Sequence, residues 1–170
     1  SQGGAEVLIV NMVFVRPRQS KVDVTAPAPA PSADVETLAD LPYIAGLTPE
    51  YTQHLGLRWA SGALPFSGSN TASFSGYCRF RVPSGNAEGL VAQLDAWPCP
   101  SLSLVSGPAA ASSAMWTGHI VQVPADGSGW FRFDYETVVG AGGLHTAVGR
   151  LYAPSGELCA FTEQLVAVFA

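Results

Sequence analysis

The chain has 170 residues, of which 48% are hydrophobic and only 12% are charged, and its formal net charge is −5. This length suits one domain of about 100–150 residues plus an extension, and such a chain buries roughly 70% of its unfolded surface. Only eight residues are lysine or arginine, which argues against a nucleic-acid binder that needs a basic face. No apolar run approaches the ~20 residues of a membrane span, and no secretory signal sequence is visible.

The first sixteen residues contain a nearly continuous apolar run, from Val7 to Val15. Its composition is typical of a strand that is buried on both faces. A central strand does not normally open a domain. Residues 1–16 could therefore be the last strand of a preceding or partner domain in a longer chain, and residues 5–16 would then pair with a strand outside residues 70–170. The alternative is an ordinary first strand that remains after removal of a tag.

Residues 17–69 are expected to form a connector. Its first part alternates proline and alanine, a composition that favours extended polyproline II geometry. Glycine, proline and serine interrupt any periodic pattern after residue 49. Within this irregular part, residues 51–59 could start a strand that covers the edge of the main domain.

The three cysteines, Cys78, Cys99 and Cys159, are far apart and show no Cys-x-x-Cys spacing. An odd number with this spacing argues against a disulfide framework and against a cysteine-based zinc site. We therefore expect reduced, mostly buried thiols in a cytoplasmic protein. His119 and His145 are isolated from other ligand types, so neither a metal nor another cofactor is expected.

The chain from residue 70 onward predicts one helix among several strands. Apolar residues at helical spacing, with Ser84 or Asn86 as the cap, predict a helix of about three turns that Pro98 and Pro100 end. These apolar residues are Ala87, Leu90, Val91, Leu94 and Trp97. The predicted strands are 71–82, 112–123, 130–139, 144–152 and 157–169. Short turns between them indicate an antiparallel sheet whose single apolar face the helix covers, which is an α+β fold.

Three segments carry a resemblance to a known family. In order and with matching spacing, residues 90–98 (LVAQLDAWP), 111–120 (ASSAMWTGHI) and 156–165 (GELCAFTEQL) resemble motifs of the thioesterase-like superfamily, related to acyl-CoA thioesterase II. The resemblance implies a hotdog fold, in which the sheet wraps one central helix, over residues 70–170. Residues 5–18 resemble the last strand of the N-terminal hotdog in a double-hotdog chain, which implies a second hotdog domain as partner.

The resemblance also implies an activity and a set of site residues. The implied activity is hydrolysis of a fatty-acyl thioester of coenzyme A or of acyl carrier protein. The family's catalytic set is an Asp, a Thr or Ser, and a Gln that positions water; the Gln matches Gln164 and the hydroxyl matches Thr137. Met115 occupies the position of the Asp and is expected to contact the substrate. Its thioether can neither take a proton from water nor attack the thioester carbonyl. The alternative is therefore a catalytically silent hotdog half that serves as scaffold, dimer interface or acyl-CoA binder.

Other polar residues are candidates for the same chemistry. Asp95, near the end of the predicted helix, is either a catalytic carboxylate or a partner for the amides of the following turn. Ser112, like its neighbour Ser113, could bind water, although a serine without an adjacent base is a poor nucleophile. His119 could replace the missing base, because an ordinary histidine pKa suits that role; a structural strand histidine is the alternative.

The predicted helix start and the arginines are candidates for substrate contacts. In hotdog enzymes the helix N-terminus is the expected oxyanion site, which implies that Asn86 and Ala87 could offer backbone N–H groups to the acyl carbonyl. The arginines are few and scattered. One or two of them could hold the phosphates of coenzyme A, or they could simply pair with surface carboxylates.

Overall fold

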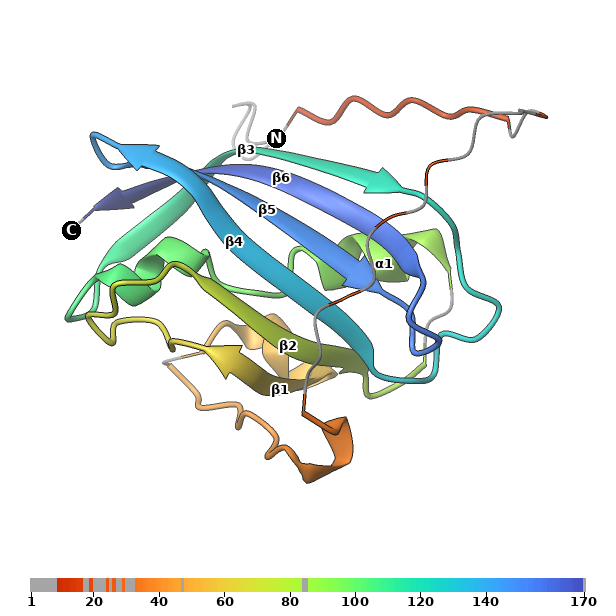
Figure 1. Ribbon diagram of the computed structural model, residues 1–170, viewed down its shortest axis with the longest axis horizontal. Coiled ribbons are helices and arrows are strands. Elements are labelled where there is room, and N and C mark those ends of the chain that lie inside the picture. Colours follow the sequence, from red (N-terminus) through yellow and green to blue (C-terminus); the bar gives the residue numbers. More distant parts are fainter. Residues whose placement is uncertain are drawn as a thin grey trace.

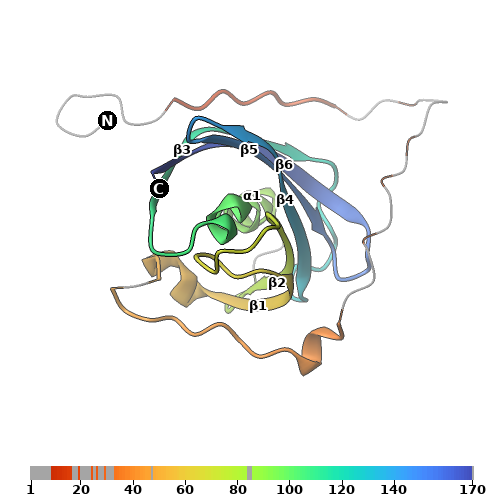
Figure 2. The same cartoon turned by 60° about the vertical axis from the view of Figure 1, so that its left-hand side comes forward.

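A six-stranded antiparallel sheet curves around a single α-helix (Figures 1 and 2). The computed structural model describes residues 9–16, 19, 24, 26, 29, 33–46, 48–83 and 86–169. The strands are β1 (Leu55–Gly62), β2 (Ser73–Phe80), β3 (Ala110–Ile120), β4 (Phe131–Ala141), β5 (Leu144–Tyr152) and β6 (Leu158–Phe169), in the sheet order β1-β2-β4-β5-β6-β3. The helix α1 spans Ala87–Leu94, and the 3₁₀ helices η1, η2 and η3 span Val35–Thr37, Glu50–His54 and Pro100–Leu104.

The alternation of side chains along β4 shows how the sheet builds the core. Phe131, Phe133 and Tyr135 are buried, whereas Asp134 and Glu136 between and after them are at least partly exposed. Because successive side chains of a strand point to opposite faces, the first three lie on the face that covers α1. Each of the five strands predicted after residue 70 is present, and the sheet has one helix-covered face and one outer face, as predicted.

The helix α1 buries one side and is shorter than predicted. Asn86 caps it, since its side chain accepts a hydrogen bond from the Gly89 amide at 2.9 Å. Leu90 and Leu94 are buried on the side facing the sheet. The helix ends at Leu94, with Asp95 as its C-cap, instead of continuing through Trp97. Proline disfavours the helical conformation of the residue before it, and here Pro98 follows Trp97.

The three cysteines are free and buried, as predicted. Cys78 on β2 donates to Oε1 of Gln93 at 3.3 Å, which joins the sheet to α1. Burial raises the pKa of the Cys78 thiol to about 12. The thiol therefore remains protonated at neutral pH and is a packing group.

The sheet also includes a strand that precedes residue 70 in the chain, because β1 pairs with β2 along its length. This strand confirms the expectation that the irregular segment contains an edge strand. Part of the connector covers its free edge: the Leu41 amide donates to the Leu57 carbonyl at 2.7 Å, and Arg58 pairs with Asp40 at 2.6 Å. The opposite edge strand, β3, has no buried residue.

Residues 9–16 form no helix or strand and are exposed, and they lie outside the six-stranded sheet. The earlier part of the predicted first strand lies outside the described residues, so its pairing with another domain stays a prediction. No helix among the described residues is long and apolar enough to cross a membrane.

Gly149 on β5 is required for close packing on the inner face of the sheet. A Cβ added there would lie 2.3 Å from Cζ of Phe133, whose side chain is completely buried. The absent side chain lets the phenyl ring lie against the backbone of the neighbouring strand. The ring cannot move aside without disturbing the core, because protein interiors are close-packed.

We therefore expect Gly149→Ala to lower the free energy of unfolding by about 1–3 kcal/mol, the usual effect of overpacking. Urea denaturation measures the change. Gly107→Ala is the matched control, since nothing lies within 4 Å of a Cβ built at that position. Equal stability of the two variants would contradict this account of the core.

Candidate functional site

Gln164 is a buried amide on the inner face of β6, and two other strands supply its partners. The Tyr135 hydroxyl on β4 donates to Oε1 of Gln164 at 2.5 Å. Nε2 of Gln164 donates to the Ser113 hydroxyl on β3. The side chain of Gln164 is 7% exposed. Three strands thus fix the direction in which the amide points, because a buried polar group without partners costs about 1–3 kcal/mol.

Thr137 lies in the same cross-strand row as Gln164. Ala147 on β5 pairs with Thr137 on one side and with Gln164 on the other, so all three side chains share the inner face. Neighbouring strands are about 4.8 Å apart, which places the backbones of Thr137 and Gln164 roughly 10 Å apart. The side chain of Ala147 is only a methyl group, so it does not fill the space between the two polar side chains.

The hydroxyl of Thr137 is buried and has no hydrogen-bond partner within the described part of the chain. A hydroxyl carries one donor and two acceptor positions, and nearly all buried ones in proteins are used. Gln164 also has a second amide hydrogen besides the one that Ser113 accepts. The row therefore holds two polar groups that can bind a small polar molecule or a carbonyl oxygen.

Asp95 is the carboxylate that acts electrostatically on this cluster. Burial raises the pKa of Tyr135, and the charges of Cys99 and Asp95 raise it further. Desolvation also raises the pKa of Asp95 itself. A carboxyl group with a raised pKa is a better proton acceptor, which suits a general base. Asp95 is the C-cap of α1 and is exposed, and among the described residues no hydrogen bond joins it to Tyr135, Thr137 or Gln164.

Met115 and Ser112 do not face Gln164. Trp116 stands opposite Gln164, whereas Met115 stands opposite Leu165 and is 48% exposed. Ser112 pairs with Ala167, which shares the outer face with Leu165 because both are an odd number of residues from Gln164. An irregularity in the pairing of β3 between Ser113 and Met115 shifts the alternation. As a result the hydroxyl beside Gln164 belongs to Ser113.

The structure also separates His119, Asn86 and Ala87 from the cluster. His119 stacks on Phe161 with ring centroids 4.4 Å apart, and this pair lies on the outer face of the sheet. Asn86 and Ala87 lie at the N-terminal end of α1, and eight helical residues span roughly 12 Å. Among the predicted site residues, the geometry therefore brings together Gln164 and Thr137, and Asp95 is linked to them only by its electrostatic effect on Tyr135.

Sequence reasoning missed Tyr135 as a member of the cluster. Its place in an alternating run on β4 predicts burial, and a buried tyrosine needs a partner for its hydroxyl. That signal points to a hydrogen bond but not to its acceptor, because Tyr135 and Gln164 are 29 residues apart in the chain.

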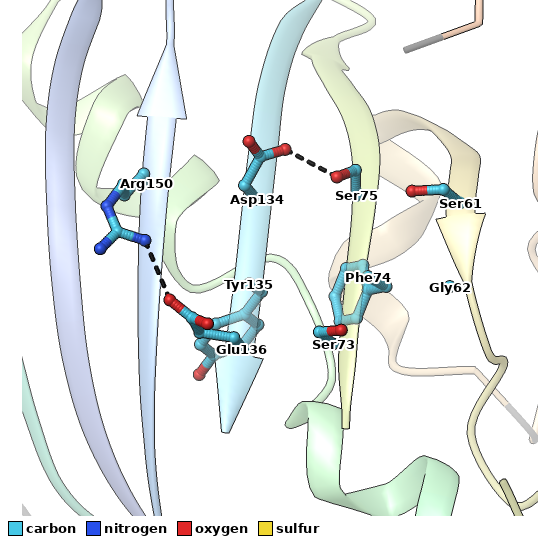
Figure 3. Close-up of a pocket in the computed structure, with 9 residues that line it drawn as sticks. All are labelled: Ser61, Gly62, Ser73, Phe74, Ser75, Asp134, Tyr135, Glu136 and Arg150. Atoms are coloured by element: carbon cyan, nitrogen blue, oxygen red, sulfur yellow. Dashed lines mark hydrogen bonds and ion pairs between the residues drawn. The ribbon is translucent and has the colours of Figure 1, made fainter. Parts of the chain in front are cut away.

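A shallow hollow of about 270 Å³ lies across β1, β2, β4 and β5 (Figure 3). Its charged groups have partners: Ser75 donates to Asp134 at 2.7 Å, and Arg150 pairs with Glu136 at 3.2 Å. It lies on the outer face, away from Gln164, and contains no group poised for nucleophilic or acid–base chemistry. No group of three or more His, Cys, Asp or Glu in the described part of the chain could hold a metal ion.

The model of the family described as "Acyl-CoA thioesterase C-terminal domain" matches residues 15–168. No curated protein matches the chain. Three solved structures share the fold at low sequence identity. The first is a protein of unknown function with a hot dog fold from Alicyclobacillus acidocaldarius, at 17% identity and a TM-score of 0.70, covering 91% of this chain and 58% of that one.

The second is the tesB protein of Mycobacterium avium subs paratuberculosis, at 18% identity and a TM-score of 0.69, covering 88% of this chain and 57% of that one. The third is an acyl-CoA thioesterase II from Mycobacterium marinum, at 14% identity and a TM-score of 0.60, covering 91% of this chain and 60% of that one. The predicted hotdog fold is thereby confirmed. The chain spans about three fifths of the length of these structures.

The hydrogen bond from Tyr135 to Gln164 gives a first prediction for the cluster. Tyr135→Phe leaves the buried Oε1 of Gln164 without its donor, so we expect the free energy of unfolding to fall by about 1–3 kcal/mol at neutral pH. The pKa of Tyr135 is raised in the folded state. Above pH ~10 the unfolded chain gains stability by ionising this phenol, whereas the folded chain does not.

The stability difference between wild type and Tyr135→Phe should therefore shrink as pH rises beyond ~10. Urea titrations between neutral pH and pH ~11 measure it. Tyr77→Phe serves as control, since the Tyr77 hydroxyl makes only a 3.4 Å exposed contact with the Ala33 carbonyl. A pH-independent difference would contradict the assignment.

Proposed function

The chain belongs to the acyl-CoA thioesterase C-terminal domain family, and on this premise we propose that it hydrolyses fatty-acyl thioesters, with water held by Gln164 and Thr137. The scissile carbonyl would lie on the inner face of the sheet, over Ala147. Water adds to the carbonyl carbon, the carbon–sulfur bond breaks, and the thiol leaves with a proton. The carrier would be coenzyme A or acyl carrier protein.

The observation that carries this proposal is the buried hydroxyl of Thr137, which has no partner among the described residues and faces Gln164 across Ala147. Evolved interiors seldom leave such a group unused. A water or a carbonyl oxygen between the two side chains would satisfy both. Gln164 enters the reaction in one orientation, because Tyr135 and Ser113 hold its amide, and fixed donors avoid the cost of reorganisation at the transition state.

The proton acceptor in this proposal is Asp95. Met115, at the position of the family's Asp, has no basic group and lies on the outer face. Asp95 is near enough to Tyr135 to raise its pKa, and its own raised pKa suits a base. We propose that Asp95 removes a proton from the water, directly or through a second water.

One observation favours a second candidate, the catalytically silent half. The hydrogen-bond partners of Gln164, Tyr135 and Ser113, are both neutral groups of this chain, and no carboxylate hydrogen-bonds to the cluster among the described residues. In that case the space between Gln164 and Thr137 over Ala147, which we call the niche, would bind an acyl thioester without cleaving it. A cytoplasmic location stays a prediction from the sequence.

We also propose that a second hotdog domain pairs with the exposed side of the sheet at β3. Its residues are all at least partly exposed, and an unpaired edge of this length invites another strand. Beside it, Met115 and Val139 are 48% and 63% exposed and lie in one outer row with Thr146 and Leu165. The partner could be the rest of a longer chain or a second copy.

Thr137→Val tests the hydrolase proposal with little change in shape. Loss of one positioned donor usually lowers kcat by about 100–1,000-fold, and we expect that decrease with a small change in KM. Release of free thiol from a series of short to long acyl-CoA substrates measures the rate. Thr146→Val is the matched control, because Thr146 pairs with Leu165 on the outer face.

Unchanged kcat in Thr137→Val would contradict the assignment of that hydroxyl. Acyl-CoA binding by the wild type without turnover would contradict hydrolysis and establish the silent half. Because Val fills the same space as Thr, equal melting temperatures would show that the variant is folded.

The partner proposal predicts self-association or pairing that depends on the β3 side. Analytical ultracentrifugation should give a mass near twice 17.7 kDa. Met115→Glu combined with Val139→Glu should return the protein to a monomer, because two charges would be buried without partners. Val91→Glu, at an exposed position on α1, should leave the association unchanged. A monomeric wild type would exclude the second copy as partner.

A further inference from the structure

Five arginines supply all the lysine and arginine of residues 33–169. Three of them form ion pairs: Arg58 with Asp40 and Glu36, Arg132 with Asp134, and Arg150 with Glu136. Arg79 and Arg81 pair with no carboxylate among the described residues. These two arginines flank Phe80 on the outer face, Arg79 within β2 and Arg81 just after its end. The uncompensated positive charge of the fold is therefore concentrated at one place.

Neutral groups hold both guanidinium groups in position. The Arg79 guanidinium lies over the ring of Trp130, 4.2 Å from its centroid. Nε of Arg81 donates to the Gln53 carbonyl at 3.0 Å. Stacking uses the face of a guanidinium and leaves its N–H edge available, and a single bond from Nε leaves the terminal nitrogens available. The arginines are thus oriented without being neutralised.

Arg79 and Arg81 line a second pocket, of about 320 Å³, together with Asp40 and Ser128. Asp40 is the carboxylate in this lining, and Arg58 already binds it at 2.6 Å. Neighbouring positive charges lower the pKa of Asp40, with the hydrogen bond from Arg58 as the largest cause. The pocket keeps a positive character even though the whole chain has a net charge of −5.

We propose that this pocket binds a phosphate group. Two neighbouring guanidinium groups match the oxygens of a phosphate or pyrophosphate, to which arginine donates paired hydrogen bonds. Ser128, also in the lining, donates its amide and its hydroxyl to Asp126, so the two arginines are the donors for the ligand. The site is separate from the thioester niche and does not depend on the proposed hydrolysis. Cys78, next to Arg79, pairs with Phe131, and Thr137 is six residues farther along β4, roughly 20 Å away and on the other face.

Isothermal titration calorimetry on the full chain tests the proposal with three probes: inorganic phosphate, pyrophosphate and coenzyme A. We expect Arg79→Met and Arg81→Gln each to weaken binding at least tenfold, and the double variant to abolish it at millimolar probe. The methionine keeps an aliphatic contact with Trp130. Arg150→Gln is the control, because Arg150 lies on the same face but is paired with Glu136.

Each outcome decides the question. Binding of all three probes that the variants weaken identifies a general phosphate site. Binding of coenzyme A alone, weakened in the same way, identifies the phosphates of the coenzyme as the ligand. Failure of every probe to bind the wild type at millimolar concentration overturns the proposal. Equal affinities in wild type, Arg79→Met and Arg81→Gln, with melting temperatures that show folded proteins, overturn it as well.

Discussion

The burial of one amide on the inner face of the sheet determines how the candidate site is built. Gln164 can remain there only because Tyr135 donates to its oxygen and Ser113 accepts from its nitrogen. These partners come from strands on either side of β6 in the sheet order. The antiparallel register places these partners beside Gln164. A buried amide that would otherwise destabilise the fold therefore becomes an oriented hydrogen-bond donor.

Irregular pairing in two strands decides which side chains join that amide. The register of β3 shifts between Ser113 and Met115, and that of β4 shifts between Thr137 and Val139. A single extra residue moves every later side chain to the other face. The first shift places Ser113 inside and Met115 outside. The inner hydroxyl of Thr137 lies just before the second shift, so both irregularities border the niche.

The same irregularities mark the limit of prediction from the sequence. Apolar spacing located α1, and alternation located β4, because both signals are local. Gln164 and Thr137 could be placed on inner faces in the same way. Ser113 could not be preferred over Ser112, because a shift in register leaves no local sequence signal of its own. The end of α1 at Leu94 depends on Trp97 preceding a proline, and the continuing apolar spacing obscured that effect.

The distribution of charge over the two faces separates two kinds of chemistry. None of the strand residues that face α1 is charged, and at neutral pH Asp95, at the end of that helix, is the charge with influence on Tyr135. Asp95 is itself exposed, so solvent screens part of its effect on the buried phenol. Arg79 and Arg81 are exposed on the outer face, where solvent also screens their charge. Their affinity for an anion depends on preorganisation: Trp130 and the Gln53 carbonyl hold the two guanidinium groups in place, so binding an anion costs less side-chain entropy.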